Sequence, residues 1–129
     1  MDMGLGKKNA LVMSSSRGLG LGIAEALADE GVNVLLTGRS EDKLKENIEK
    51  INNRGGGKAY YVRVDLNEPE SVALIYAAVQ KFLGGADILV NNTGGPPPGK
   101  MVDVDIAALP GQLEAMVTRV VQITDKLLP

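Results

Sequence analysis

Short apolar runs are spaced along the chain and separated by longer segments of mixed composition. The runs at 10–13, 32–36, 59–64 and 88–90 are mostly apolar and are bounded by polar residues or glycine. Runs of this length without regular polar alternation are typical of strands buried on both faces of a parallel sheet. We therefore predict four strands at these positions.

Apolar side chains recur every three or four residues in the segments 19–28, 40–54, 69–82 and 113–127. This spacing places them on one face of a helix, and the charged residues between them fall on the solvent face. Ser40 has the short polar side chain that suits a helix N-cap, and glycines follow the first three segments. We predict four helices, one after each strand.

Strands and helices that alternate in this way indicate an α/β fold, in which helices cover both faces of a parallel sheet. Right-handed crossovers then give the first half of a Rossmann-type, doubly wound sheet with strand order 3-2-1-4 and three layers, α/β/α. Residues 1–129 are expected to form a single domain of this kind. A ligand in such a sheet binds beyond the carboxyl ends of the strands, where the order reverses between strands 1 and 4.

The composition removes several kinds of chemistry. The 129 residues include no Cys and no His, which excludes thiol nucleophiles, disulfides, Cys/His metal sites and imidazole acid–base catalysis within this chain. A formal net charge of -2 and a pI near 5.1 argue against a nucleic-acid partner. No run of 18 apolar residues is present, so no membrane partner is expected and the expected location is cytoplasmic.

A turn rich in serine and glycine follows the first strand and opens the first predicted helix. A helix N-terminus offers free N–H groups and a partial positive charge, and glycine lets a diphosphate approach the backbone. Serine hydroxyls can add further donors. The candidate cofactor-binding residues here are Ser14, Ser16, Arg17, Gly18, Leu19 and Gly20. The alternative is a plain tight turn in which glycine serves only close packing.

The residues after the second strand bear on the kind of dinucleotide. NAD-binding sheets of this topology place Asp or Glu there, to accept a hydrogen bond from the ribose 2′-hydroxyl. This chain reads Leu-Thr-Gly-Arg-Ser at 36–40 and has no carboxylate before Glu41. Arg39 and Arg17 together suit a 2′-phosphate, so NADP(H) is predicted in preference to NAD(H). The alternative is a pair of solvated surface arginines.

Polar residues also follow the other two strands. Asp65, next to Leu66, is placed to accept a hydrogen bond from an adenine amino group, unless it serves as a turn or helix-capping residue. After the fourth strand, Asn91, Thr93 and Gly94 supply amides and bare backbone, although an ordinary loop has this composition as well. The four strand ends together make a stronger case for a dinucleotide site than any one of them.

These motifs resemble those of the short-chain dehydrogenase/reductase family, in particular its 3-oxoacyl-acyl-carrier-protein reductases, over the whole chain. The resemblance rests on Ser14-x-x-x-Gly18-Leu19-Gly20, on the segments 37–40 and 64–66, and on Asp-Ile-Leu-Val-Asn-Asn-Thr-Gly at 87–94. It implies a nicotinamide cofactor and reversible hydride transfer to a small carbonyl substrate. In the family's NADP-preferring members, basic residues occupy the positions of Arg17 and Arg39.

The chain also departs from the family pattern. Ser14 replaces the first motif glycine, so the turn must avoid a strongly positive φ or carry modest strain. Thr93 stands where the family has alanine, and Met116 stands near the position of the family's proton-relay asparagine.

The family's catalytic Tyr-x-x-x-Lys is not found in these residues. Tyr60, Tyr61 and Tyr76 are followed four positions later by Val, Asp and Gln, and none by Lys. We therefore expect the cofactor-binding half of an NADP(H)-dependent carbonyl reductase, truncated before its catalytic segment. The alternatives are a non-catalytic nucleotide-binding module, a sugar or polyol dehydrogenase of the family, and a sugar-nucleotide epimerase or dehydratase, whose usual glycine spacing the glycines at 18, 20 and 22 do not match. The apolar last helix predicts a homodimer or homotetramer that associates through it.

Overall fold

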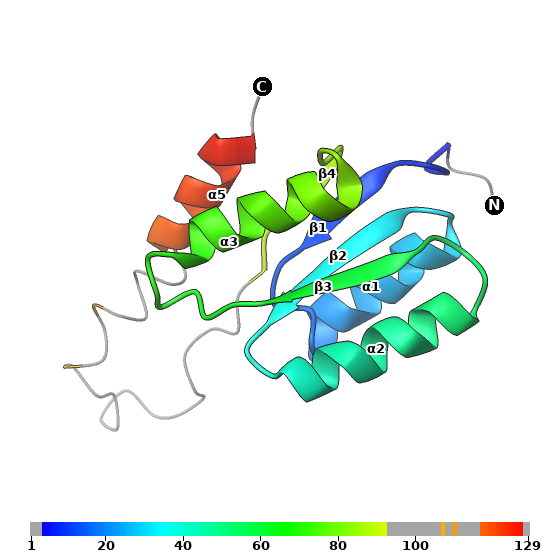
Figure 1. Ribbon diagram of the computed structural model, residues 1–129, viewed down its shortest axis with the longest axis horizontal. Helices are drawn as coiled ribbons and strands as arrows, with labels where there is room; N and C mark the ends of the chain where they lie inside the picture. Colours follow the sequence, from blue (N-terminus) through cyan, green and yellow to red (C-terminus); the bar gives the residue numbers. More distant parts are fainter. Residues whose placement is uncertain (1–3, 93–106, 108–109, 111–116, 128–129) are drawn as a thin grey trace.

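Four parallel strands form one sheet in the computed structural model, which describes residues 4–92, 107, 110 and 117–127 (Figure 1). The strand order is β3-β2-β1-β4, and each neighbouring pair is parallel. The predicted Rossmann-type fold and its strand order are therefore confirmed. The elements, in chain order, are β1 (Asn9–Val12), α1 (Gly18–Asp29), β2 (Asn33–Gly38), α2 (Glu41–Asn53), β3 (Ala59–Arg63), α3 (Ser71–Ala78), the π-helical turn η1 (Val79–Leu83), β4 (Ile88–Val90) and α5 (Arg119–Leu127).

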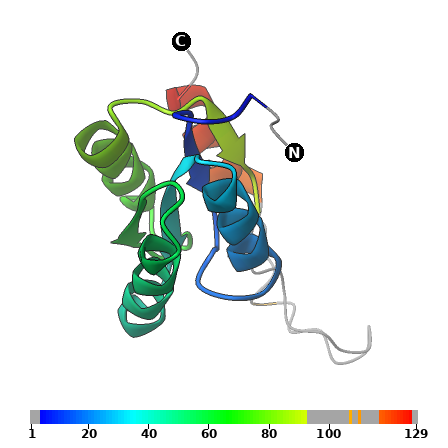
Figure 2. The same ribbon diagram turned by 90° about the vertical axis from the view of Figure 1, so that its right-hand side faces the viewer.

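The helices form a layer on each face of the sheet, with α1 and α2 on one face and α3 and α5 on the other (Figures 1 and 2). Successive strand residues point to opposite faces, so each strand feeds two separate apolar clusters. The cluster under α1 and α2 includes Ala10, Val12, Val34, Leu36, Ala24, Ala28, Leu44 and Ile51. The cluster under α3 and α5 includes Leu11, Met13, Leu35, Ile75, Val79 and Ile123. Burial on both faces is the reason that the strands read as apolar runs.

The element boundaries differ from the sequence predictions by small amounts at most ends. β2 continues to Gly38, two residues beyond the predicted end, because Thr37 and Gly38 pair with Val62 and Arg63 of β3. The helix predicted over 69–82 is divided into α3 and η1. Positions 113–116 of the predicted last helix lie outside the described residues.

Ser40 caps α2 as predicted. Its hydroxyl accepts a hydrogen bond from the Lys43 N–H at 3.4 Å, and Glu41 and Asp42 lie in the first turn, where the helix dipole favours negative charge. Nowhere in the described part of the chain is a helix both long and apolar enough to cross a bilayer.

Candidate cofactor-binding site

The turn after β1 is tied to the end of β2 by a compact set of hydrogen bonds. The Ser14 N–H donates to Thr37 Oγ1 at 3.0 Å, and the Ser15 N–H donates to the Thr37 carbonyl at 2.8 Å. In return the Thr37 N–H donates to Ser15 Oγ at 3.0 Å, and that hydroxyl donates to the Val12 carbonyl at 2.8 Å. The buried Ser15 hydroxyl is therefore committed to the fold, which leaves Ser14 and Ser16 as the serines able to add donors for a ligand.

The N-terminus of α1 is open at this turn. Arg17 is the N-cap residue with an extended φ of -163°, and Gly18 follows with a positive φ of 64°. The first backbone hydrogen bond of the helix runs from the Leu21 N–H to the Arg17 carbonyl at 3.5 Å. The N–H groups of Gly18, Leu19 and Gly20 therefore have no intrahelical acceptor, and they form the positive end of the helix dipole. This is the backbone geometry that binds a diphosphate.

Gly20 is required by the packing of the turn. A Cβ at Gly20 would overlap the Ser14 carbonyl and would lie 2.8 Å from Asn92 Nδ2. That Asn92 amide donates to the Met13 and Ser14 carbonyls at 3.4 Å and 3.3 Å, which joins the end of β4 to the turn after β1. Asn92 was not among the predicted site residues, although it lies inside the motif that carried the resemblance.

The two candidate selector arginines lie on the surface at the carboxyl ends of β1 and β2. Both Arg17 and Arg39 are exposed. Among the described residues neither guanidinium has a hydrogen bond or ion pair; the Arg39 carbonyl, in contrast, accepts from Arg63 Nε at 3.0 Å. Both side chains are therefore able to meet an anionic ligand without breaking a contact within this part of the chain.

A second residue outside the predicted set contacts the same turn from α2. Asn47 Nδ2 donates to the Ser16 carbonyl at 2.6 Å, and the Asn47 side chain is 6% exposed. The sequence did carry a signal, because Asn47 interrupts the buried stripe that Leu44 and Ile51 form on α2.

Asp65 follows β3, where it forms an Asx turn. Its Oδ1 accepts from the Asn67 N–H at 2.9 Å and from Asn67 Nδ2 at 3.1 Å. The turn role weighed from the sequence is therefore present, and Oδ2 has no partner among the described residues. Leu66 packs against the cluster under α3.

Asn91 is exposed at the end of β4. Thr93, Gly94 and Met116 lie outside the described residues. The predicted positions that the structure describes all fall near the carboxyl ends of the parallel strands, as the topology requires.

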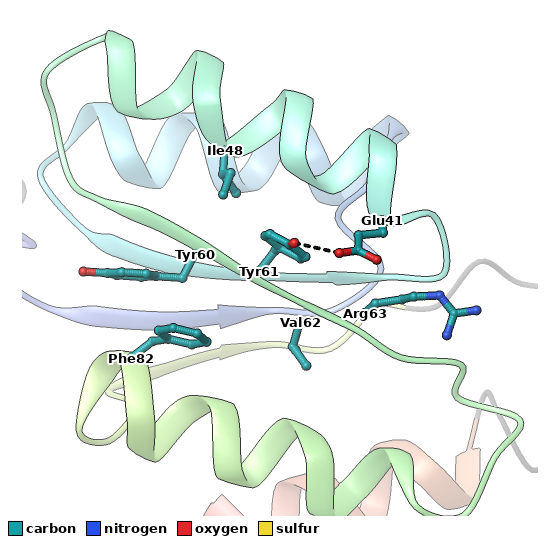
Figure 3. Close-up of a pocket in the computed structure, with 7 residues that line it drawn as sticks. All are labelled: Glu41, Ile48, Tyr60, Tyr61, Val62, Arg63 and Phe82. Carbon is teal, nitrogen blue, oxygen red and sulfur yellow. Dashed lines mark hydrogen bonds between the residues drawn. The ribbon is translucent and has the colours of Figure 1, made fainter.

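A hollow of about 450 Å³ lies elsewhere, along the outer edge of β3 (Figure 3). Tyr60 and Phe82 stack there with ring centroids 5.2 Å apart, and Tyr61 Oη donates to Glu41 Oε1 at 3.0 Å. This hydrogen bond, with Lys45 nearby, holds the pKa of Glu41 below its usual range, whereas desolvation and the same bond raise the pKa of Tyr61. The tyrosine and carboxylate satisfy each other, so this hollow offers less for recognising a dinucleotide than the helix N-terminus does.

The family described as short chain dehydrogenase matches residues 8–129, and the chain belongs to it. A 3-oxoacyl-acyl-carrier-protein reductase from Aquifex aeolicus is 40% identical over 94 residues, which are 73% of this chain and 38% of that protein. A glucose 1-dehydrogenase from Gluconobacter oxydans is 35% identical over 113 residues, which are 88% of this chain and 42% of that protein.

Solved structures of the family share the fold. The crystal structure of L-sorbose reductase from Gluconobacter frateurii, complexed with NADPH and L-sorbose, superposes with a TM-score of 0.90 at 35% identity. The match covers 98% of this chain and 48% of that one. The chain thus spans less than half the length of each of these three relatives.

Proposed function

We propose that this chain is the cofactor-binding half of an NADP(H)-dependent carbonyl reductase, which transfers hydride between a nicotinamide and a ketone or alcohol. The observation that carries the proposal is the open N-terminus of α1, where the N–H groups of Gly18, Leu19 and Gly20 have no intrahelical acceptor and a Cβ at Gly18 would meet nothing within 4 Å. Free N–H groups with open space beside them suit a diphosphate. Membership of the short-chain dehydrogenase family supports the reaction class.

Each predicted residue has a defined part in holding the dinucleotide. The N–H groups of Gly18 to Gly20, with Ser14 and Ser16 beside them, bind the diphosphate. Arg17 and Arg39 bind the 2′-phosphate by charge-assisted hydrogen bonds. The free oxygen of Asp65, beside Leu66, accepts from the adenine amino group. Asn91, Thr93 and Gly94, from the motif after β4, supply the amides and bare backbone that the proposal assigns to the rest of the dinucleotide.

The bound nicotinamide supplies the hydride, and the residues of this chain set its position. The proton for the substrate oxygen comes from a Tyr whose pKa a neighbouring Lys lowers, as the resemblance implies, and no Tyr-x-x-x-Lys occurs within residues 1–129. The proposal therefore treats residues 1–129 as one cofactor-binding domain and assigns the Tyr-x-x-x-Lys motif to a different part of the enzyme.

Two substrate classes follow from the relatives, a 3-oxoacyl thioester and a ketose. Both present a ketone to the same hydride chemistry, so assays with one of each separate the reductase proposal from its sugar or polyol alternative. The proposal includes a cytoplasmic homodimer or homotetramer that contacts neither nucleic acid nor membrane. Val117 and Val121, 55% and 60% exposed, supply an apolar surface at the last helix for that association.

The decisive experiment uses the protein at its full encoded length. Titration with NADPH, followed by the fluorescence of the dihydronicotinamide, is expected to saturate, and reduction of an acetoacetyl thioester or of L-sorbose is expected to consume NADPH. Saturable binding without turnover of any ketone would favour the non-catalytic nucleotide-binding module. Absence of binding would refute both.

Replacing Arg39 with Asp tests the predicted preference for NADP(H). A carboxylate repels the 2′-phosphate and accepts from a 2′-hydroxyl, so Arg39→Asp is expected to raise KM for NADPH by about 10- to 100-fold while KM for NADH falls. Lys58→Asp makes the same charge change at the amino end of β3 and is the matched control. A preference unchanged in Arg39→Asp would remove Arg39 as the selector.

A further inference from the structure

The two turns assigned to the cofactor are held together as one unit. The turn after β1 and the end of β2 exchange backbone and side-chain hydrogen bonds through Ser15 and Thr37. Ser16 packs closely on Gly38, because a Cβ added at Gly38 would lie only 3.0 Å from the Ser16 Cβ. The position of Ser16 therefore depends on β2 and on the helix that follows it.

Asn47 is the third part of this connection, and it is a polar side chain at a buried position of α2. It is the buried polar residue of α2, and its neighbours on the buried face are Leu44 and Ile51. A buried amide is costly unless it is hydrogen-bonded, and an aliphatic side chain would fill this position in the core as well. What the amide adds is its 2.6 Å hydrogen bond to the Ser16 carbonyl.

We propose that Asn47 is a positioning residue for cofactor selection, which orients Arg17 relative to Arg39 so that both meet the 2′-phosphate. The inference rests on the proposed function. Arg17 directly follows Ser16, whose carbonyl Asn47 holds, and Arg39 lies two residues before α2, the helix that carries Asn47. The Asn47–Ser16 hydrogen bond therefore ties the residue before Arg17 to the helix after Arg39, in addition to the Ser14–Thr37 and Ser15–Thr37 hydrogen bonds between the turns.

The role predicts a selective effect on the two cofactors. The diphosphate rests on the turn after β1 alone, whereas the 2′-phosphate needs Arg17 and Arg39 from both turns at once. Loosening the link between the turns therefore weakens NADPH binding more than NADH binding. A merely structural role would weaken both equally, since both use the same diphosphate turn.

Asn47→Leu tests this at full encoded length, because leucine keeps the branched arrangement of side-chain heavy atoms and continues the apolar stripe while removing the donor. Dissociation constants for NADPH, NADH and 2′,5′-ADP are measured by titration. Loss of one hydrogen bond of ordinary strength is expected to raise the constants for NADPH and 2′,5′-ADP about three- to tenfold, with that for NADH changed less than about twofold. Asn52→Leu is the matched control, since Asn52 on the same helix binds the backbone of Ala59 instead.

Gly38→Ala is a contrasting variant, because its added methyl would lie 3.0 Å from the Ser16 Cβ and 3.2 Å from its Oγ. Since the proposed function places Ser16 beside the diphosphate, Gly38→Ala is expected to weaken NADPH and NADH binding alike. Equal losses for both cofactors in Asn47→Leu, or no loss in that variant, would overturn the inference while the proposed function stands. If the unmodified protein binds neither NADPH nor NADH, the proposed function fails, and the inference fails with it.

Discussion

Ser14 adopts a backbone conformation that disfavours its own side chain. Its φ of 49° lies in the left-handed region, where a Cβ crowds the following carbonyl group. The sequence left two possibilities for this serine, and the structure takes the strained one. The hydrogen bonds of its N–H to Thr37 and of its carbonyl to Asn92 hold the conformation in place.

Ser14→Gly is expected to stabilise the protein. Relief of about 1–2 kcal/mol of backbone strain exceeds the extra entropy of glycine in the unfolded chain, so the free energy of unfolding should rise by about 0.5–1 kcal/mol. Denaturant unfolding measures this. Ser16→Gly, at a position whose φ is not positive, should lower the same quantity; a gain in both variants would contradict the explanation.

Two glycines of α1 differ sharply in what surrounds them. Gly20→Ala places a methyl on the Ser14 carbonyl, and we expect a loss of about 1–3 kcal/mol of stability and of at least tenfold in NADPH affinity. Gly22 has open space at its Cβ position, so Gly22→Ala should stabilise the helix by about 0.5–1 kcal/mol with NADPH binding unchanged. Thermal unfolding and cofactor titration of the pair check this, and a similar response in both would contradict the packing argument.

The residues of the candidate site were predictable where they belong to a local motif. Gly18, Gly20 and Arg17 follow one strand directly, so their spacing alone places them at a helix N-terminus. Asn47 and Asn92 were missed, because their contacts to the turn span 31 and 78 positions in the sequence. Periodicity marks a residue as buried but does not say which carbonyl a buried amide will reach.

At the scale of elements, the free edge of β3 is partly closed by a side chain. The pairing with β2 directs the backbone groups of Ala59 and Tyr61 outward. Asn52 Oδ1 accepts from the Ala59 N–H at 2.8 Å and Asn52 Nδ2 donates to the Ala59 carbonyl at 3.2 Å. The asparagine thus satisfies the backbone as a further strand would, and it shortens the edge that is open to another chain.

Asn52→Ala removes both of these hydrogen bonds. We expect the free energy of unfolding to fall by about 1 kcal/mol, since the freed groups are partly solvated, and amide exchange at Ala59 to become faster. Asn53→Ala is the control. Among the described residues, the Asn53 side chain makes no hydrogen bond to β3. Unchanged exchange at Ala59 would contradict the capping role.

The element that sequence patterns did not reveal is η1. The apolar stripe of 69–82 continues through it, so periodicity alone predicted an uninterrupted helix. In the structure the Gly84 N–H donates to the Val79 carbonyl five residues earlier at 3.0 Å, and Phe82 stacks on Tyr60 of β3. The Tyr60–Phe82 contact joins residues 22 positions apart in the sequence. Local helix propensity carries no information about such a contact, so it could not predict the π-helical turn.

At the scale of the whole molecule, the layered architecture followed from the order of elements. Alternating strands and helices leave few ways to bury both sheet faces, and right-handed crossovers reduce these to the strand order that is observed. The assembly of the complete protein is not fixed by this logic. It depends on which surfaces of this half remain apolar, and two such surfaces are the edge of β4 and the exposed side of α5.

Those surfaces lead to a prediction for residues 1–129 expressed alone. β4 is half-buried and, among the described residues, pairs only with β1. A hollow of about 330 Å³ lies beside this strand. It is lined by Ala86, Asp87, Ile88, Leu89, Asn91, Thr124 and Leu127. Because an open apolar edge and the exposed Val121 of α5 both favour association, sedimentation equilibrium should give a mass above 13.6 kDa or the protein should precipitate. Val121→Lys should reduce this association, and a well-behaved monomer before any substitution would show that the two surfaces do not drive it.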